Sequence, residues 1–256
     1  MTNSEHPERV DAYLVAGGRF HDIDYARLQL LTLLAEHPHV RVKVGSDYED
    51  IDSITASAFL ITYTCDVRPS EAAQVAIQDW VTAGGRVMAL HATNAALDFD
   101  PPNPVKTPVV FPKWTELLGT RFVSHPPNAP FLVELSDPGH WLVAGIEPFE
   151  TTDELYLFEY HDRSSLHPLL QTRWQGEATG YEVEDWTDCE PIHLVMYTKA
   201  EGDGAILYNT LGHCRGHWDM PEVVAYHPSE DRCSWDIAQY HELLRRGLRW
   251  AMGESS

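Results

Sequence analysis

Four apolar runs alternate with amphipathic segments along the first 90 residues, and this alternation narrows the folds open to the chain. Apolar residues recur at helical spacing after Asp24, a candidate helix cap, and again after Pro69. The runs, each as long as a buried strand, are Val10–Ala16, Val40–Val44, Ala58–Tyr63 and Arg86–Leu90. Three strand–helix–strand units imply right-handed crossovers. The sequence therefore predicts a doubly wound, flavodoxin-like α/β fold: a mostly parallel sheet with helices on both faces.

The rest of the chain is predicted to add strands to that sheet and to close with a helix over Trp235–Met252. Asp98–Pro108 is rich in proline and is expected to form an exposed loop that could border a ligand site. Gln175–Glu190 and Asp219–Arg232 lack periodicity and are expected to be surface insertions, with binding loops as the alternative. The further strands are predicted over Phe131–Leu135, Glu154–Tyr160, Leu169–Arg173, Ile192–Tyr197 and Ala205–Asn209. Residues 1–256 are expected to form one domain.

Composition and charge exclude several classes of partner. The formal net charge of -21 repels phosphate backbones and anionic lipid surfaces, so we expect neither nucleic acid nor membrane partners. Met1–Val10 carries no basic segment followed by an apolar run, which predicts a cytoplasmic protein. The four cysteines are widely spaced without a C-x-x-C pair, which predicts free thiols rather than a disulfide framework or a thiolate zinc site.

The segment Arg86–Asn94 is predicted to carry a strand directly into a tight turn, with His91 at the corner. In α/β enzymes this corner projects a side chain into the active cleft, and hydrolases and amidotransferases place Ser or Cys there. The alternative is that His91 only caps the following helix. A histidine at the corner cannot form a thioester, so we expect no glutaminase activity.

Other polar groups follow strand ends at the same predicted edge of the sheet. Gly17 and Gly18 permit a close backbone turn, and His21 and Asp22 come directly after them. Because ligands bind at the carboxyl edge of open parallel sheets, His21, Asp22 and His91 could share one cleft. Asp22 could instead cap a helix, with His21 on the surface. Glu154, next to the strand predicted at 154–160, could equally be a solvated strand end.

A second polar cluster runs from Gly212 to Trp218. His213 and His217 have the spacing of a metal-binding pair on a helix, but Gly212 and Gly216 favour a loop. Cys214 suggests a thiol nucleophile, although sequence neighbours in extended backbone point in opposite directions. His125, before two prolines, could be a polar group in a turn.

These segments together resemble one known family, the ThuA-like (trehalose utilisation) family. The resemblance rests on Gly17-Gly-x-x-His21-Asp22, Leu90-His91-Ala92, Trp114-x-x-Leu-Leu-Gly119, His125-Pro126, Asp153-Glu154-Leu-Tyr156, Gly212-His213 and Arg249-Trp250-Ala-x-Gly253, and it spans nearly the whole chain. It implies a class I glutamine amidotransferase-like fold in which the corner cysteine is replaced. It also implies a role in the metabolism of disaccharides or oxidised sugars.

Two functions from different classes follow. In the first, the protein is a carbohydrate-active enzyme in which His91 acts as general base or metal ligand and Asp22 or Glu154 orients an imidazole. His21, His125 and His213 would hold sugar hydroxyls, and Asn94 and Trp218 are further candidates for substrate binding. A divalent metal could bind His21, His91 and His213.

In the second, the chain is a non-catalytic sugar-binding or regulatory protein that kept the scaffold after losing the nucleophile. In both, we expect a small neutral sugar as the ligand, since few basic residues flank the candidate cleft. Tryptophan faces could cover a pyranose ring, with Trp114, Trp141, Trp186 and Trp218 as candidates. A homo-oligomer is also compatible with the sequence.

Overall fold

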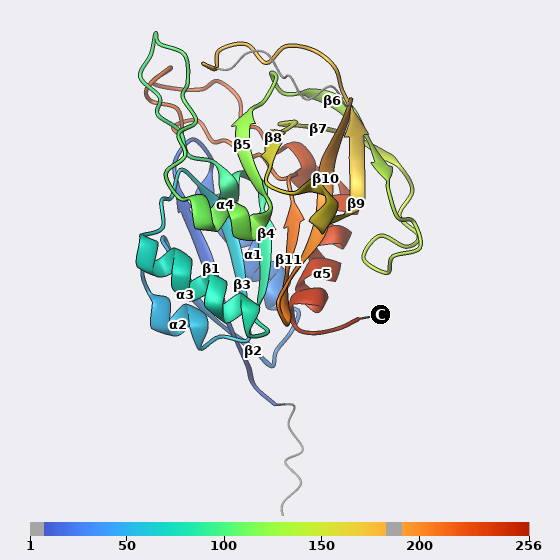
Figure 1. Ribbon diagram of the computed structural model, residues 1–256. Helices are drawn as coiled ribbons and strands as arrows, with labels where there is room; N and C mark the ends of the chain where they lie inside the picture. Colours follow the sequence, from blue (N-terminus) through green and yellow to red (C-terminus); the bar gives the residue numbers. More distant parts are fainter. Residues whose placement is uncertain (1–7, 183–190, 256) are drawn as a thin grey trace, which may run out of the picture.

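The computed structural model describes residues 8–182 and 191–255, and its centre is a nine-stranded sheet (Figure 1). One half of the sheet is parallel and has the order β2-β1-β3-β4-β11. These strands are β1 (Val10–Gly18), β2 (Val40–Gly45), β3 (Phe59–Cys65), β4 (Arg86–Leu90) and β11 (Gly204–Asn209). This is the flavodoxin-like strand order, so the predicted doubly wound architecture is confirmed.

The other half of the sheet is antiparallel and continues from β11 in the order β10-β9-β6-β7. Its strands are β6 (Ala129–Leu135), β7 (Phe149–Asp153), β9 (Leu166–Arg173) and β10 (Ile192–Glu201). A separate pair, β5 (Thr120–Ser124) and β8 (Leu157–Tyr160), lies outside this sheet. The predicted extension by later strands is therefore correct for four of them, and β7 was not predicted.

The strand predicted over residues 154–160 is wrong in its first half. Strand β8 begins only at Leu157, and it pairs with β5 rather than with the main sheet. The physical reason is local: the backbone N–H of Glu154 donates to the side chain of Asp153 at 2.8 Å. That bond replaces a ladder hydrogen bond, and the chain turns inward at Glu154.

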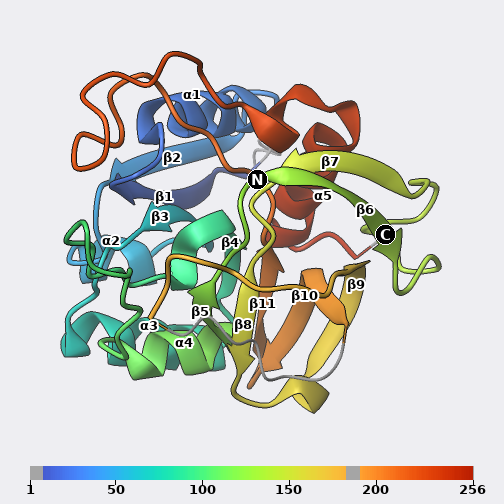
Figure 2. The ribbon, with the colours of Figure 1, turned by 90° about the horizontal axis from the view of Figure 1, so that it is seen from above.

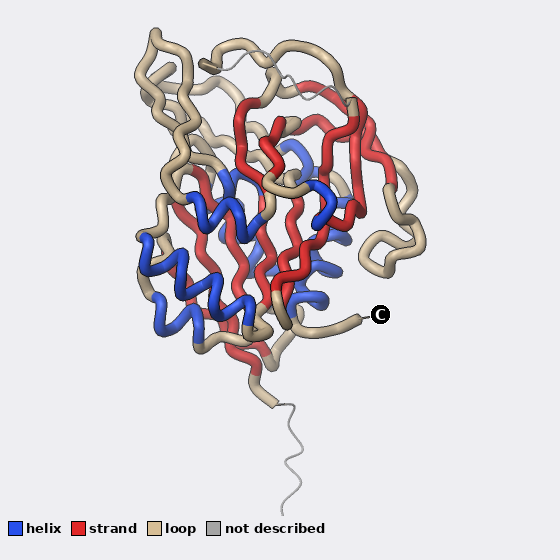
Figure 3. Tube along the Cα trace, in the orientation of Figure 1, coloured by secondary structure: helices blue, strands red, loops and turns tan. Residues whose placement is uncertain are grey.

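Helices cover both faces of the sheet (Figures 1 and 3). On one face lie α1 (Ile23–Leu34) and α5 (Ala238–Ala251). On the other lie α2 (Ile51–Thr55), α3 (Glu71–Thr82) and α4 (Pro112–Leu118). Short 3₁₀ turns complete the chain: η1 (His91–Asn94), η2 (Arg163–Ser165) and η3 (Cys233–Asp236).

Strand β1 shows how the sheet divides two hydrophobic cores. Its Leu14 packs with the α1 and α5 side, whereas Tyr13 and Val15 pack with the α2, α3 and α4 side. Because successive side chains of a strand point to opposite faces, a strand apolar on both faces must be central and covered twice. Across residues 8–182 and 191–255, no helix has the length and apolar character required to span a bilayer.

The start of α1 corrects the predicted cap. The side chain of Asp22, not that of Asp24, accepts a hydrogen bond from the Tyr25 amide at 3.0 Å. The last helix also begins later than predicted: Trp235 belongs to η3, and α5 starts at Ala238.

Candidate functional site

The corner after β4 has the backbone geometry expected of an active-site turn. His91 has a φ of 49°, in the left-handed region that a non-glycine residue rarely adopts. The conformation is held from β11 and the loop after it: the Tyr208 hydroxyl donates to the His91 carbonyl at 2.6 Å, and His91 Nδ1 lies 2.8 Å from the Thr210 carbonyl oxygen. The predicted corner is thus confirmed, and it aims the imidazole at the carboxyl edge of the parallel strands.

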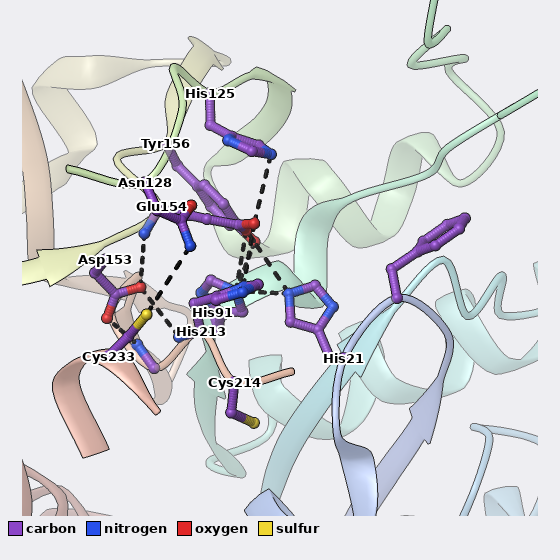
Figure 4. Close-up of polar contacts among 12 residues, drawn as sticks. His21, His91, His125, Asn128, Asp153, Glu154, Tyr156, His213, Cys214 and Cys233 are labelled. Carbon is purple, nitrogen blue, oxygen red and sulfur yellow. Dashed lines mark hydrogen bonds and ion pairs between the residues drawn. The ribbon is translucent and has the colours of Figure 1, made fainter. Parts of the chain in front are cut away.

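Four strand ends deliver four donor groups to one point (Figure 4). His21 follows β1, His91 follows β4, Glu154 follows β7 and His213 follows β11. One ligand atom from each lies within 4.8 Å of every other, and all four residues are buried. Their closest approaches are 2.9 Å between the Nε2 atoms of His21 and His91, and 3.1 Å between His213 Nδ1 and Glu154 Oε1. We call these four residues the His₃Glu cluster.

Backbone carbonyls fix which nitrogen of two imidazoles carries the proton. A carbonyl can only accept, so Nδ1–H of His91 donates to Thr210, and Nδ1–H of His21 donates to Arg19 across 3.3 Å. Both Nε2 atoms are then left with lone pairs, and they face each other at 2.9 Å. Two lone pairs at that distance repel unless a shared proton or a metal ion lies between them. The arrangement is the one that metal-binding histidines use, with the far nitrogen held by a hydrogen bond.

The pKa values of Glu154, His213 and His21 are shifted by burial and by their neighbours. Burial alone would raise the pKa of Glu154, but neighbouring His125 and His213 hold it well below its usual range. Burial would lower the pKa of His213, yet attraction to Glu154 and the contact with Asp231 raise it to about 9. Burial lowers the pKa of His21 to about 3 despite the adjacent Glu154. In the metal-free protein the cluster therefore holds one anion and one cation, Glu154 and His213, beside a neutral His21.

Both ring nitrogens of His213 are nonetheless buried without a hydrogen bond. Nδ1 is close to Glu154, but the angle does not suit a hydrogen bond, and Nε2 is 3.9 Å from Asp231. Buried imidazole nitrogens without hydrogen bonds are costly even beside a carboxylate, and such groups usually serve a ligand or an ion.

A pocket with a cavity volume of about 80 Å³ opens to solvent beside the cluster. His21, Glu154, His125 and Arg215 form its polar wall, and the remainder is aromatic rings and small or aliphatic side chains. His125 Nδ1 donates to the Pro126 carbonyl at 2.8 Å, which leaves Nε2 free and 3.6 Å from Glu154. Burial lowers the pKa of His125 from its ordinary value, against the attraction of the nearby Glu154 carboxylate. His91 and His213 lie behind the pocket wall, with 0% of each residue exposed.

Asp153 anchors two members of the cluster (Figure 4). Its carboxylate accepts hydrogen bonds from the backbone amides of Glu154 at 2.8 Å and His213 at 3.0 Å. It also accepts from the amides of Gly212 at 2.9 Å and Ser234 at 3.3 Å. One buried side chain thus ties the end of β7 to the loops after β11 and before α5.

Not every predicted site residue joins the cluster. Asp22 caps α1 and forms an ion pair with Arg232 at 2.9 Å, which agrees with the alternative that it is a helix cap. Asn94 is buried and donates to Thr120 Oγ1 at 2.9 Å, linking η1 to β5. Trp218 is 69% exposed and packs edge-on against Tyr226. By contrast, the alternative of a solvated Glu154 is wrong, because only 3% of the residue is exposed.

The other aromatic and thiol candidates also lie elsewhere. Trp114 is fully buried and donates to the Thr93 carbonyl at 3.0 Å, and Trp141 packs at the edge of the core. Trp186 lies outside the described residues. Burial raises the pKa of the Cys214 thiol to about 12, and its sulfur contacts the Tyr63 hydroxyl. A thiol in that state is a poor nucleophile.

Several residues at the pocket were not predicted from the sequence. Tyr156 places its hydroxyl 2.9 Å from His91 Nε2 and donates to Glu154 at 3.3 Å. Tyr181 and Met220 line the pocket from the two segments expected to be surface insertions. Tyr156 and Asp153 belong to the Asp153-Glu154-Leu-Tyr156 motif of the family resemblance. That motif was the signal in the sequence that could have identified both residues. Nothing in the sequence pattern marked Tyr181 or Met220.

We expect no release of ammonia from glutamine, because the corner residue is an imidazole and cannot form the thioester. Cys65 ends β3 and lines the pocket, but burial raises its pKa well above the ordinary value. An ammonia assay with the purified protein checks this. A rate that survives His91→Ala but disappears in Cys65→Ser or Cys214→Ser would contradict it.

Comparisons with known proteins identify the family. Residues 14–227 match the model of the ThuA family, described as trehalose utilisation. No curated protein matches the chain. A solved structure described as ThuA-like, from Parabacteroides merdae, is 15% identical and superposes with a TM-score of 0.70, covering 97% of this chain and 92% of its own.

Two further structures share the fold. A second ThuA-like structure, from Bacteroides uniformis, is 15% identical with a TM-score of 0.66, covering 100% of this chain and 96% of its own. A β-galactosidase from Bacillus circulans is 10% identical with a TM-score of 0.50; the match covers 96% of this chain and 31% of that one. Identities this low show a shared fold and no more. The family match spans most of the chain, however, and so the protein belongs to the ThuA family.

Proposed function

We propose that this protein is a metal-dependent enzyme that acts on a small neutral sugar, moving a proton next to the carbonyl of its oxidised form. One observation carries the proposal: four buried donor atoms from four strand ends converge beside an open pocket. Membership of a family associated with trehalose utilisation supports a sugar as the ligand.

The donor set suits a first-row divalent cation such as Zn²⁺. Imidazole and carboxylate ligands bind at about 2.0–2.2 Å, which places neighbouring ligand atoms about 3.3–3.6 Å apart in a tetrahedron. In the His₃Glu cluster, Glu154 Oε2 lies 3.4 Å from His91 Nε2 and 3.7 Å from His21 Nε2, and Oε1 lies 3.1 Å from His213 Nδ1. Small side-chain adjustments would suffice. Binding would displace the proton from His213, as metal binding to histidine requires.

The polar wall assigns roles to the remaining groups. The four residues of the His₃Glu cluster would hold the cation, and a sugar oxygen that joined it as a fifth ligand would be polarised. His125 reaches the pocket, and the bond from Nδ1 to the Pro126 carbonyl directs Nε2 as the acceptor, so it would accept the proton from the carbon beside the carbonyl. The Tyr156 hydroxyl would donate to the oxygen on which negative charge develops. The base role expected of His91 thus passes to His125, since His91 is buried behind the wall.

Electrostatics favours a neutral ligand. A phosphate needs a basic clamp, and the pocket wall carries one guanidinium among the described residues, that of Arg215. Arg215 already lies 3.5 Å from Glu154 and 3.6 Å from Asp231. Carboxylate and imidazole groups suit hydroxyls, since both can accept hydrogen bonds. A location in the cytoplasm, a homo-oligomeric state and the lack of nucleic acid or membrane partners remain predictions of the sequence.

We expect Zn²⁺-loaded protein to bind trehalose or 3-keto-trehalose in preference to glucose 6-phosphate and ATP. Calorimetric titration of each ligand measures this, and His125→Gln is the matched variant for turnover. That variant should keep the metal and bind the keto-sugar, while proton exchange falls by about 100-fold, as is common when a general base is lost. Binding by the two phosphorylated ligands alone would contradict the proposal.

A further inference from the structure

The pocket beside the His₃Glu cluster has two chemically different halves. Its polar members, His21, His125 and Arg215, all lie within 3.7 Å of the Glu154 carboxylate and so form one wall. The other lining residues belong mostly to one hydrophobic cluster that includes Phe20, Leu97, Phe99, Phe122 and Met220, and Phe122 packs beside His125.

The apolar half is continuous. Phe99 meets Phe20 edge-on with ring centroids 5.8 Å apart, and Phe122 meets Tyr156 at 4.7 Å and Tyr181 at 5.9 Å. These rings come from four segments: the turn after β1, the loop after η1, the β5/β8 region and the segment that follows β9. Seen from above, those loops gather over the carboxyl edge of the parallel strands (Figure 2). Aromatic side chains from unrelated parts of the chain therefore share one wall of the pocket.

The lining offers few partners for a second sugar. A pyranose ring carries several hydroxyls, and a buried hydroxyl without a hydrogen bond is costly. Among the described residues, no Ser, Thr, Asn, Gln or Asp side chain lines the pocket, and the apolar half provides only the phenolic groups of Tyr156 and Tyr181. One sugar ring can satisfy its hydroxyls at the polar wall. A second ring pressed against Phe20, Leu97 and Met220 could not.

We infer that the substrate is a glycoside whose second half is apolar and aromatic, with the sugar at the polar wall and the aglycone packed against Phe20, Phe99 and Met220. This rests on the proposed function, because the sugar is placed by the His₃Glu cluster. Aromatic rings packed against aromatic walls gain both buried area and favourable ring geometry. The enzyme would then prefer aryl glycosides and their oxidised forms to a disaccharide such as trehalose, which would bind more weakly.

Calorimetric titration of Zn²⁺-loaded protein with four probes tests this: phenyl β-D-glucoside, methyl β-D-glucoside, trehalose and phenol. Glucosides are suitable because trehalose, named in the family description, is built from glucose. The phenyl glucoside should bind at least about tenfold more tightly than either other sugar, given the apolar area of a phenyl group. Phe99→Ala should remove most of that advantage and leave the methyl glucoside unaffected. Val109→Ala, at a 63% exposed position shortly after the same loop, is the control and should change neither.

The outcomes separate the two proposals. Equal binding of phenyl and methyl glucosides, or tighter binding of trehalose, would overturn the aromatic aglycone and leave the sugar enzyme intact. If phenol binds and loses affinity in Phe99→Ala while no glycoside binds, sugar chemistry itself is overturned, and the inference with it.

Discussion

Replacing His91 by alanine is expected to lower the affinity for Zn²⁺ by about 100-fold or more. Loss of supporting groups around a metal commonly costs 10- to about 100-fold, and loss of a ligand should cost at least the upper figure. Glu154→Gln should have a similar effect, because it keeps the shape of the side chain and removes the anion that faces four imidazoles, those of His21, His91, His125 and His213. Competition titration with a chromophoric chelator measures both variants.

The stability of the metal-free variants must be followed alongside. His91→Ala leaves the Thr210 carbonyl without its donor, which is expected to cost about 1–3 kcal/mol. Affinities are therefore measured well below the melting midpoint. His167→Ala is the control, since His167 pairs with Asp137 on the surface at 2.9 Å and lies outside the cluster. Unchanged Zn²⁺ affinity in both His91→Ala and Glu154→Gln would remove these residues from the site.

Asp153→Ala is expected to produce the largest loss of stability of any single substitution near the site. The residue is 1% exposed, and its carboxylate satisfies backbone amides of Glu154, Gly212, His213 and Ser234. Each buried amide left without an acceptor costs about 1–3 kcal/mol, so a total of about 3–6 kcal/mol is reasonable after partial relaxation. Chemical denaturation of the metal-free protein measures this loss.

Asp153→Asn separates positioning from stability. The amide keeps one acceptor oxygen but turns a donor toward backbone N–H groups, so Glu154 and His213 should shift without global unfolding. Asp153 is a positioning residue: its carboxylate binds the backbone amides of the ligands Glu154 and His213 and is not itself a ligand. In Asp153→Asn protein that remains folded, we expect weaker Co²⁺ binding and an altered visible spectrum of the bound ion. Asp137→Asn, at a surface position, is the control. An unchanged Co²⁺ spectrum and affinity in folded Asp153→Asn would show that the carboxylate is structural only.

The sequence predicted the fold best for strands that are buried on both faces of the sheet. Strands such as β3, buried along its whole length, read as continuous apolar runs, and their carboxyl ends located His21 and His91 on one edge. Strand β7 alternates buried and exposed residues over Phe149–Asp153, including two glutamate or aspartate positions, and gives no comparable signal. Its position nonetheless decides where Glu154 enters the site.

The contacts of single side chains were less predictable. Asp22 carries a carboxylate that could serve in catalysis, and it also stands where a helix cap is expected. Only the structure shows that it pairs with Arg232, 210 residues away in the chain. Likewise, Tyr181 and Met220 reach the pocket from aperiodic segments, whose path depends on tertiary packing and not on local pattern. Pattern identifies elements, whereas the pocket is built from the loops between them.

X-ray absorption at the zinc edge, on protein titrated with Zn²⁺, tests most directly whether the His₃Glu cluster binds a metal. We expect one ion per chain, surrounded by nitrogen and oxygen at about 2.0–2.2 Å with the scattering signature of three imidazoles. That signature should disappear in His91→Ala. Failure to bind one equivalent of Zn²⁺, or a first shell containing sulfur at about 2.3 Å, would contradict the His₃Glu cluster as the metal site.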